Sequence, residues 1–141
     1  MADRSKLPLP EPTPETKHFW EGTKKQELRL QRCDDCGHAY FPPRPFCPKC
    51  ASLSVEVFTA SGKGTLYSYV INQRPHPAFD GPYSIAVVTL DEGPRMMTNI
   101  INCEQTPAAL QLDMTVEATF EKMSDEISLP YFQPTHSAQE A

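Results

Sequence analysis

The sequence predicts a mainly β protein, in which a short N-terminal helix and a small metal-binding ribbon precede a five-stranded barrel. Three observations support this fold class. Two CxxC pairs lie ten residues apart in the first third of the chain, a spacing typical of zinc knuckles. From residue 55 onward, short segments of alternating apolar residues are separated by turn residues. One short helix signal interrupts these segments, between the third and the fourth of the five later strands.

The charge of the chain is unevenly distributed. Its 141 residues have a formal net charge of −5, and residues 61–141 alone hold four basic and ten acidic side chains. An acidic surface repels the phosphate backbone, so this half argues against a nucleic-acid partner. No apolar run reaches the length of a membrane span, and residues 1–6 lack the apolar core of a signal peptide. We therefore expect a cytoplasmic protein without a membrane contact.

The first segment, residues 1–16, is expected to be a Pro-rich flexible arm. Its prolines alternate strictly with other residues, at Pro8, Pro10, Pro12 and Pro14. This alternation forbids helix and favours an extended, polyproline-like chain. The arm is either a free leader or a strand of chain laid along a partner.

The next segment is expected to form a short helix that ends near Gly22. Thr13 followed by Pro14 is typical of a helix start, with threonine as the cap and proline at the first helical position. Phe19 and Trp20 are adjacent, so both cannot face the same core. Since aromatic residues are favoured anchors in interfaces, these two are candidate contacts to a partner protein.

Four cysteines then form the predicted metal site, at Cys33, Cys36, Cys47 and Cys50. Two residues between cysteines let one tight turn point both sulfurs at one ion, and two such turns complete a tetrahedron. Four thiolates fill the coordination shell, so the zinc has a structural rather than a catalytic role. Gly37 suits the positive φ that often follows a knuckle, whereas Ala51 predicts a less strictly built second turn.

Three alternatives to zinc stay open at this point. Disulfide pairing requires an oxidising compartment. A redox CxxC of the thioredoxin kind sits at the start of a helix, and no helix pattern follows either pair. Iron accepts the same S₄ tetrahedron, and spacing alone separates it poorly from zinc.

The strands are placed by alternation. One strand covers 27–32, its return lies at Tyr40 and Phe41, and another begins near Val55. Five further strands are expected at 65–72, 83–90, 95–101, 115–121 and 127–132, with a brief helix at 107–111. This order matches the OB-fold, a partly open five-stranded Greek-key barrel, and the alternative is an all-β barrel with a different closure. The expected domains are the arm (1–16), helix and zinc ribbon (17–54), OB-fold (55–134) and a C-terminal tail (135–141).

Several motifs together resemble a known family. They are Phe19-Trp20-Glu21-Gly22, Phe41-Pro42-Pro43-Arg44-Pro45, Cys47-Pro48-Lys49-Cys50, Gly62-Lys63-Gly64-Thr65 and Leu129-Pro130-Tyr131-Phe132. The family joins an N-terminal helix and a rubredoxin-like zinc ribbon to an OB-fold, and was long catalogued as a domain of unknown function. The resemblance covers about residues 17–134. One departure is Asp113, where the family often has glycine, and aspartate tolerates the same left-handed turn.

The resemblance implies a non-catalytic accessory subunit. Members of the family accompany thiolase-like enzymes, or aldolases and hydratases that shorten steroid side chains, and help to enclose their acyl-CoA substrates. The chemistry then belongs to the larger partner, and the chain is not an enzyme on its own. The residues agree, because the four histidines are scattered and no nearby motifs assemble a nucleophile with its base.

The loop 73–82 is the remaining candidate for a binding role. It connects two predicted strands through ten residues, three of them proline, and long stiffened loops often carry binding function. Arg74 could meet a CoA phosphate, and Phe79 could fill a groove of the partner. Competing functions are a single-stranded nucleic-acid-binding OB-fold, an electron-transfer module with iron in the ribbon, and a carrier that holds the acyl-CoA itself.

Overall fold

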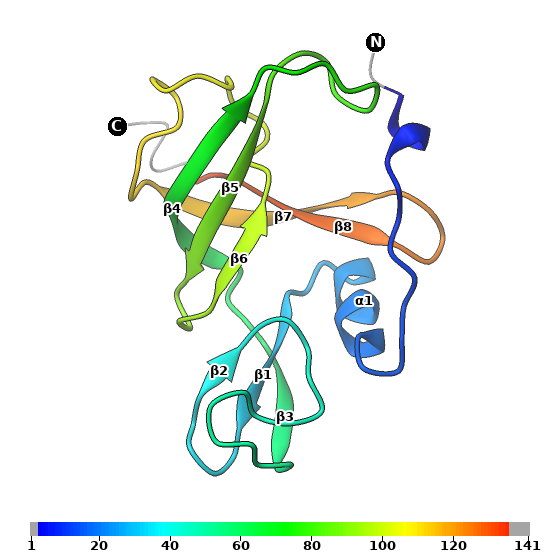
Figure 1. The fold of residues 1–141 in the computed structure, drawn as a ribbon, viewed down its shortest axis with the longest axis vertical. Coiled ribbons are helices and arrows are strands. Elements are labelled where there is room, and N and C mark those ends of the chain that lie inside the picture. Colours follow the sequence, from blue (N-terminus) through cyan, green and yellow to red (C-terminus); the bar gives the residue numbers. More distant parts are fainter. Residues whose placement is uncertain (1–2, 136–141) are drawn as a thin grey trace.

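The computed structural model describes residues 3–135 as two antiparallel β-sheets, a helix and an N-terminal arm (Figure 1). The elements are η1 (Arg4–Lys6), α1 (Lys17–Lys24), β1 (Arg29–Cys33), β2 (Ala39–Tyr40), β3 (Val55–Thr59), β4 (Lys63–Asn72), β5 (Tyr83–Leu90), β6 (Arg95–Thr98), β7 (Thr115–Lys122) and β8 (Ser128–Pro134). The mainly β fold class is thereby confirmed. The predicted tail falls outside the described residues from position 136 onward.

The smaller sheet has the strand order β2-β1-β3 and carries the cysteines. β1 pairs with β3 along its whole length, from Arg29 opposite Thr59 to Cys33 opposite Val55. Residues 55–59, which the sequence grouped with the OB-fold, are therefore the edge strand of the ribbon sheet. The division into domains otherwise stays a prediction.

The larger sheet has the order β6-β5-β4-β7-β8 and curls into a barrel. Its two edges meet through a parallel bridge between Ile100 and Phe132. There the Ile101 N–H donates to the Phe132 carbonyl at 2.8 Å, and the Phe132 N–H donates to the Asn99 carbonyl at 3.2 Å. This parallel closure between the third and the fifth barrel strands confirms the OB-fold over the alternative closure.

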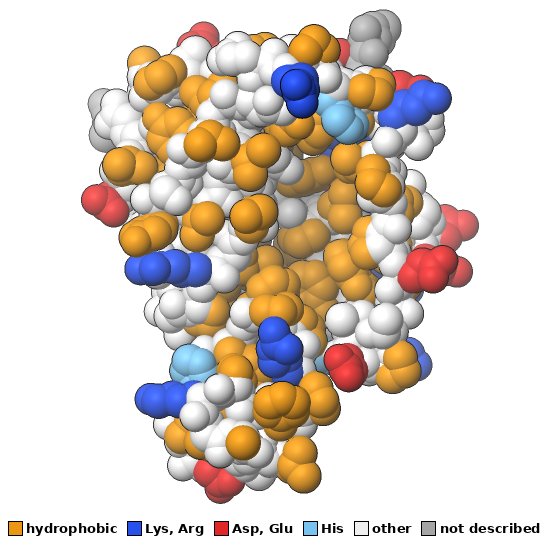
Figure 2. Space-filling view, viewed as in Figure 1, with side chains coloured by type: hydrophobic (Ala, Val, Ile, Leu, Met, Phe, Trp, Pro, Cys, Tyr) orange, Lys and Arg blue, Asp and Glu red, His pale blue; other side chains and the backbone are white. Residues whose placement is uncertain are grey.

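The core fills the barrel and continues under the helix. β5 shows the pattern, because Ala86, Val88 and Leu90 are buried while the residues between them face outward. Helix α1 and the start of the ribbon contribute Phe19, Leu28 and Leu30 to the same cluster as Phe132. The helix and ribbon therefore share one hydrophobic core with the barrel. On the opposite, outer side of the sheet, hydrophobic side chains also reach the surface over β4, β5 and β6 (Figure 2).

The helix α1 begins later and ends later than the sequence predicts. The Thr13 carbonyl accepts the N–H groups of Thr16 and Lys17, so Thr13 starts a turn that precedes the helix. Gly22 lies inside α1 and does not end it. A Cβ atom at Gly22 would lie 2.7 Å from Cδ of Arg29 and 3.0 Å from the Glu27 carbonyl oxygen. Close packing against the following strand, rather than a helix stop, explains this glycine.

The predicted helix at 107–111 is a single turn. The Thr106 carbonyl accepts the N–H groups of Ala109 and Leu110, at 3.1 and 2.9 Å, and the turn does not propagate. So short a segment does not repay the cost of helix nucleation, and the turn serves to bury Leu110, which is 1 % exposed. Asp113 then adopts φ = 68°, the left-handed conformation expected of it.

The N-terminal arm is attached to the barrel in the described structure. From η1 near the β4–β5 loop, it runs beside the barrel down to α1 (Figure 1). The Asp3 N–H donates to the Pro77 carbonyl at 2.6 Å, and the Arg4 side chain reaches three further acceptors described below. The arm is therefore docked on its own chain, whereas the proline pattern predicts either a free leader or an arm laid along a partner.

Candidate functional site

The four cysteine sulfurs converge on one point, as their spacing predicts. All four Sγ atoms lie within 4.8 Å of one another. The Cys33–Cys50 and Cys36–Cys47 sulfur pairs are each 3.6 Å apart. A tetrahedron with zinc–sulfur bonds of about 2.3 Å has sulfurs about 3.8 Å apart, so the site fits a zinc ion.

The two knuckles have the same backbone. Gly37 has φ = 76° and donates its N–H to the Cys33 carbonyl at 2.9 Å. Ala51 has φ = 65° and donates its N–H to the Cys47 carbonyl at 2.8 Å. The expectation of a looser second turn is therefore wrong, because alanine adopts the left-handed conformation despite its Cβ.

Backbone N–H groups supply the local stabilisation of the thiolates. The Cys36 N–H donates to the Cys33 sulfur at 3.4 Å, and the Lys49 N–H donates to the Cys47 sulfur at 3.3 Å. Burial raises the pKa of the Cys47 thiol, but the N–H groups of Cys50 and Lys49 and the thiols of Cys36 and Cys50 bring this pKa down to about 7. The backbone N–H of Ser52 lowers the pKa of the Cys50 thiol, but the neighbouring thiols and burial raise it to about 12. A lowered pKa favours the thiolate, which is the form that binds metal.

The alternatives to a metal site fit the geometry poorly. Sulfurs 3.6 Å apart are well beyond the roughly 2.05 Å of a disulfide bond. Neither CxxC pair begins a helix, as a thioredoxin-like site requires. The four sulfurs would complete the shell of the ion and leave no position for a substrate, so the role of this metal site is structural.

Phe19 and Trp20 separate, one inward and one toward the surface. Phe19 is 3 % exposed and belongs to the core, so the expectation that it contacts a partner is wrong. Trp20 packs edge-on against Phe19, with ring centroids 4.9 Å apart. On its other side Trp20 lines a groove of about 460 Å³ between the arm and α1.

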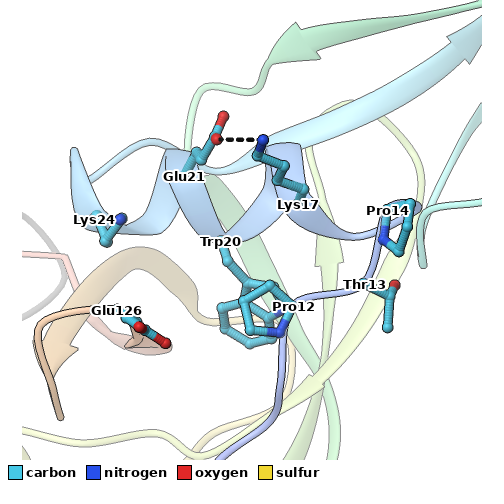
Figure 3. A pocket seen from close by; sticks show the side chains of 8 residues that line it. All are labelled: Pro12, Thr13, Pro14, Lys17, Trp20, Glu21, Lys24 and Glu126. Carbon is cyan, nitrogen blue, oxygen red and sulfur yellow. Dashed lines mark ion pairs between the residues drawn. The ribbon is translucent and has the colours of Figure 1, made fainter.

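The groove combines apolar and charged walls (Figure 3). Pro12 and Trp20 both line this groove, and Lys17 forms an ion pair with Glu21 at 3.9 Å along the helix. The other lining residues are Thr13, Pro14, Lys24 and Glu126. Trp20 is thus a surface residue that the arm covers in part.

The loop 73–82 places its two candidate residues differently. Arg74 is exposed, and its backbone N–H donates to the Asn72 side-chain oxygen at 3.2 Å. Phe79 is half-buried and stacks on Tyr83, with ring centroids 4.0 Å apart and planes 11° apart. Phe79 therefore supports the loop internally, whereas Arg74 stays available at the surface.

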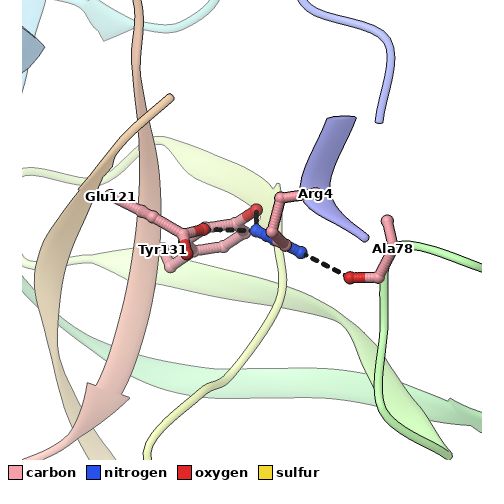
Figure 4. Close-up of polar contacts among 4 residues, drawn as sticks. All are labelled: Arg4, Ala78, Glu121 and Tyr131. Atoms are coloured by element: carbon pink, nitrogen blue, oxygen red, sulfur yellow. Dashed lines mark hydrogen bonds and ion pairs between the residues drawn. The ribbon is translucent and has the colours of Figure 1, made fainter. Parts of the chain in front are cut away.

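Arg4 is the residue that sequence reasoning missed (Figure 4). Its guanidinium donates to the Ala78 carbonyl at 3.0 Å and to the Tyr131 hydroxyl at 2.7 Å, and it forms an ion pair with Glu121. It also lies 5.2 Å from the centroid of the Phe79 ring. Burial lowers the pKa of Arg4, but the contacts with Glu121 and Tyr131 raise it above its ordinary value. Nothing in a proline-rich leader marks this arginine as an anchor.

The candidate residues do not form one site. The cysteine cluster lies in the ribbon at one end of the molecule, and the loop 73–82 lies at the other end, beside η1 (Figure 1). Trp20 faces the groove between these ends. No helix in the described part of the chain is long and apolar enough to cross a membrane.

The fold and the metal site together define a zinc-ribbon OB-fold protein. Two family models match consecutive parts of the chain: the rubredoxin-like zinc ribbon domain of ChsH2 covers residues 20–56, and the C-terminal OB-fold domain of ChsH2 covers residues 58–121. The chain is also 37 % identical to a DUF35 domain-containing scaffold protein of Methanocaldococcus jannaschii, over 67 % of this chain and 68 % of the relative. The chain belongs to this ChsH2-like DUF35 family.

Two relatives longer than this chain extend the comparison. The chain is 37 % identical to a probable enoyl-CoA hydratase alpha subunit of Thermomonospora curvata, over 87 % of this chain and 39 % of that protein. It is 34 % identical to the 3-oxo-4,17-pregnadiene-20-carboxyl-CoA hydratase alpha subunit of Mycobacterium tuberculosis, over 84 % of this chain and 37 % of that protein. The chain thus spans less than two fifths of both subunits.

The structural matches agree with the family assignment. A chain of the solved Ltp2-ChsH2(DUF35) aldolase has a TM-score of 0.77 and 35 % identity, covering 89 % of this chain and 98 % of that one. A DUF35 protein of unknown function from Sulfolobus solfataricus has a TM-score of 0.62 and 16 % identity, covering 86 % of each chain. This second match supports the fold alone.

Proposed function

We propose that this chain is a non-catalytic accessory subunit that binds a thiolase-like or aldolase enzyme acting on an acyl-CoA. The observation that carries the proposal is the cysteine site, whose four thiolates would fill the shell of a zinc ion. A zinc ion held in this way stabilises a fold and cannot activate water or substrate. The subunit would support assembly of the enzyme or complete its CoA-thioester site.

The histidines favour the same conclusion. Burial, and after it the nearby Arg29, lowers the pKa of His18 in the helix. His76 accepts the Ala78 N–H through Nδ1 at 3.0 Å and so serves to shape its loop. His38 stacks on Tyr40 inside the ribbon. The contacts of His76 and His38 give structural roles to two residues that could otherwise act as general bases.

The names of the relatives support a partner that handles acyl-CoA. Two of them are alpha subunits of CoA-thioester hydratases, one solved relative is part of an aldolase, and the Methanocaldococcus jannaschii relative is a scaffold protein. An accessory role fits all of these descriptions. We extend it to steroid side-chain or other lipid metabolism as the class of pathway.

Two surface residues are proposed contacts within such a complex. Trp20 offers an aromatic wall in a groove, and aromatic anchors in grooves dominate many interfaces. Arg74 stands exposed on a proline-stiffened loop, where its guanidinium could bind a CoA phosphate. An acyl-CoA at the shared interface would then contact both proteins.

Co-purification with the thiolase-like or aldolase protein encoded beside this chain tests the proposal. Size-exclusion chromatography with light scattering should show one complex at micromolar concentration, with a mass equal to the sum of both proteins in a whole-number ratio. Separate elution of two unassociated proteins would refute the accessory role.

The competing nucleic-acid function finds little support in the aromatic residues. The Arg95 guanidinium lies 3.8 Å from the Tyr67 ring centroid and occupies one face of this exposed ring. Tyr83 is stacked on Phe79 within the loop. Two of the tyrosines that could stack on bases are therefore engaged within the chain, next to an acidic barrel.

A further inference from the structure

The outer face of β4, β5 and β6 carries an apolar patch that nothing in the described structure covers. Cross-strand pairing sets its members side by side, with Val70 opposite Ile85 and Val87 opposite Met97. Val70 is 61 % exposed, Ile85 36 % and Met97 74 %. Figure 2 shows hydrophobic side chains gathered over these strands on the viewed face. We call Tyr67, Val70, Ile85, Val87, Arg95 and Met97 the outer sheet patch.

The sequence of β5 indicates that this face is meant to be covered. An antiparallel strand with one solvated face normally alternates apolar and polar residues, whereas an unbroken apolar run is typical of strands buried on both faces. In β5 such a run covers residues 85–88, between Ser84 and Thr89, yet only its inward residues Ala86 and Val88 are buried. Ile85 and Val87 therefore fit a strand whose second face is covered in an assembly.

A β-bulge in β4 adds an aromatic residue to the patch, and β6 adds a cation. The pairing of β4 with β5 shifts between Leu66 and Ser68, which turns the extra residue Tyr67 to the outer face. Tyr67 is 48 % exposed, and the Arg95 guanidinium lies 3.8 Å from its ring centroid. Within residues 3–135, Arg95 forms no ion pair. Tyrosine and arginine are among the residues most enriched in the energetic centres of interfaces.

We propose that the outer sheet patch is the docking surface for the partner enzyme, which presents an apolar surface with a carboxylate opposite Arg95. This inference rests on the proposed accessory function. The charges of the patch favour a protein with an apolar surface and one carboxylate over a polyanion or a membrane. The patch carries one cation, and residues 61–141 have a net charge of −6, so a polyanion or an anionic lipid surface finds little attraction.

A second copy of this chain is a poorer occupant. A two-fold interface must be self-complementary, since the same surface contributes from both copies. The patch has a cation but no acid, so a facing copy would leave both Arg95 side chains without a counter-ion. A different protein can supply the missing carboxylate.

The test measures binding of the full chain to its partner enzyme by isothermal titration calorimetry. Met97→Asp and Val70→Asp place a charge on the apolar patch and should each weaken binding about 100-fold or more, as expected of substitutions at an interface centre. Leu53→Asp is the matched control, because Leu53 is 79 % exposed but lies in the ribbon. It should change the dissociation constant less than about threefold. Thermal unfolding of all three variants near the wild-type midpoint confirms folding.

The outcomes separate this inference from the proposed function. If the wild-type chain binds the enzyme and the two patch variants bind equally well, the patch is not the docking surface, although the accessory role stands. Equal weakening by Leu53→Asp also overturns the assignment to this face. If the patch variants instead convert a self-associated chain into a monomer while enzyme binding is unchanged, a second copy is the occupant. If the wild-type chain does not bind the enzyme, both the docking surface and the accessory function are refuted.

Discussion

At the scale of single residues, the metal site shows that a knuckle can keep its left-handed backbone conformation even where the residue is not glycine. Gly37 and Ala51 occupy equivalent positions after their CxxC pairs, and both have left-handed φ values. Glycine adopts this conformation freely, whereas alanine does so at a cost of roughly 1–2 kcal/mol. The convergence of the four sulfurs holds Ala51 in place.

We predict that Ala51→Gly stabilises the zinc-bound protein by about 0.5–1 kcal/mol. The substitution relieves the left-handed strain, and part of the gain is lost to the greater freedom of glycine in the unfolded chain. Urea unfolding in the presence of zinc measures the change. Ala39→Gly in β2, where the backbone is extended, is the control and should destabilise by a similar amount. Equal destabilisation by both variants would contradict the strain at Ala51.

Cys36→Ser should abolish zinc binding and lower the unfolding temperature. A structural site of this type contributes on the order of 10 kcal/mol to folding, and the ribbon shares its core with the barrel through Leu30. Elemental analysis by mass spectrometry should find one zinc per wild-type chain and almost none in the variant. Cys103→Ser, which changes the cysteine outside the cluster, should retain zinc. Full zinc occupancy in the Cys36 variant would rule out the four-thiolate site.

At the scale of elements, the docking of the N-terminal arm was the feature hardest to predict from the sequence. Alternating prolines correctly indicate an extended chain, but its docking depends on acceptors contributed by Ala78, Glu121 and Tyr131. These acceptors lie far from Arg4 in the sequence, and only the fold brings them together. The arm in turn holds the loop that carries Arg74.

We predict that Arg4→Ala releases the arm and costs about 1–2 kcal/mol of stability. Two hydrogen bonds are lost, and the partly exposed ion pair with Glu121 adds little because solvent screens it. Hydrogen exchange should accelerate at the amide of Asp3, which is bonded to Pro77 in the wild type. Lys6→Ala, an exposed neighbour in η1, should change stability by less than about 0.5 kcal/mol. Unchanged protection of Asp3 in the Arg4 variant would show that the arm is held by other contacts.

Strands were easier to predict than helices for a physical reason. Alternation is a local pattern, and it correctly indicated the position of each barrel strand, although β6 ends before Ile101 and β3 joins the ribbon sheet. The predicted helix ends were wrong because tertiary packing decided them. Gly22 packs against the Arg29 side chain of β1, and residues 107–111 bury Leu110 after one turn. Neither contact is visible in local sequence.

The same distinction applies to the candidate sites. The cysteines could be predicted because their chemistry fixes their spacing. The fates of Phe19 and Phe79 could not, because Phe19 is buried in the shared core, whereas Phe79 is half-buried and packs between Tyr83 and Arg4. Trp20 and Arg74 remain proposed contacts at the surface.

At the scale of the whole molecule, zinc acts as a clamp at one end of a continuous core. The cysteine cluster fixes the ribbon, the ribbon and α1 share Phe19 and Leu30 with the barrel, and the barrel presents the outer sheet patch. The architecture combines one cysteine cluster, whose four sulfurs would close the shell of a metal ion, with an exposed apolar face. It therefore fits a subunit that acts through a partner enzyme.

Titration of the partner enzyme with this chain tests that central claim most directly. The measurement is the turnover of the enzyme's acyl-CoA substrate at increasing molar ratios of the two proteins. We predict no turnover by the chain alone, and a rise in the enzyme's kcat/KM that saturates at a fixed ratio and is lost with Cys36→Ser. Turnover by the isolated chain, or enzyme activity independent of the chain across the whole titration, would contradict the accessory role.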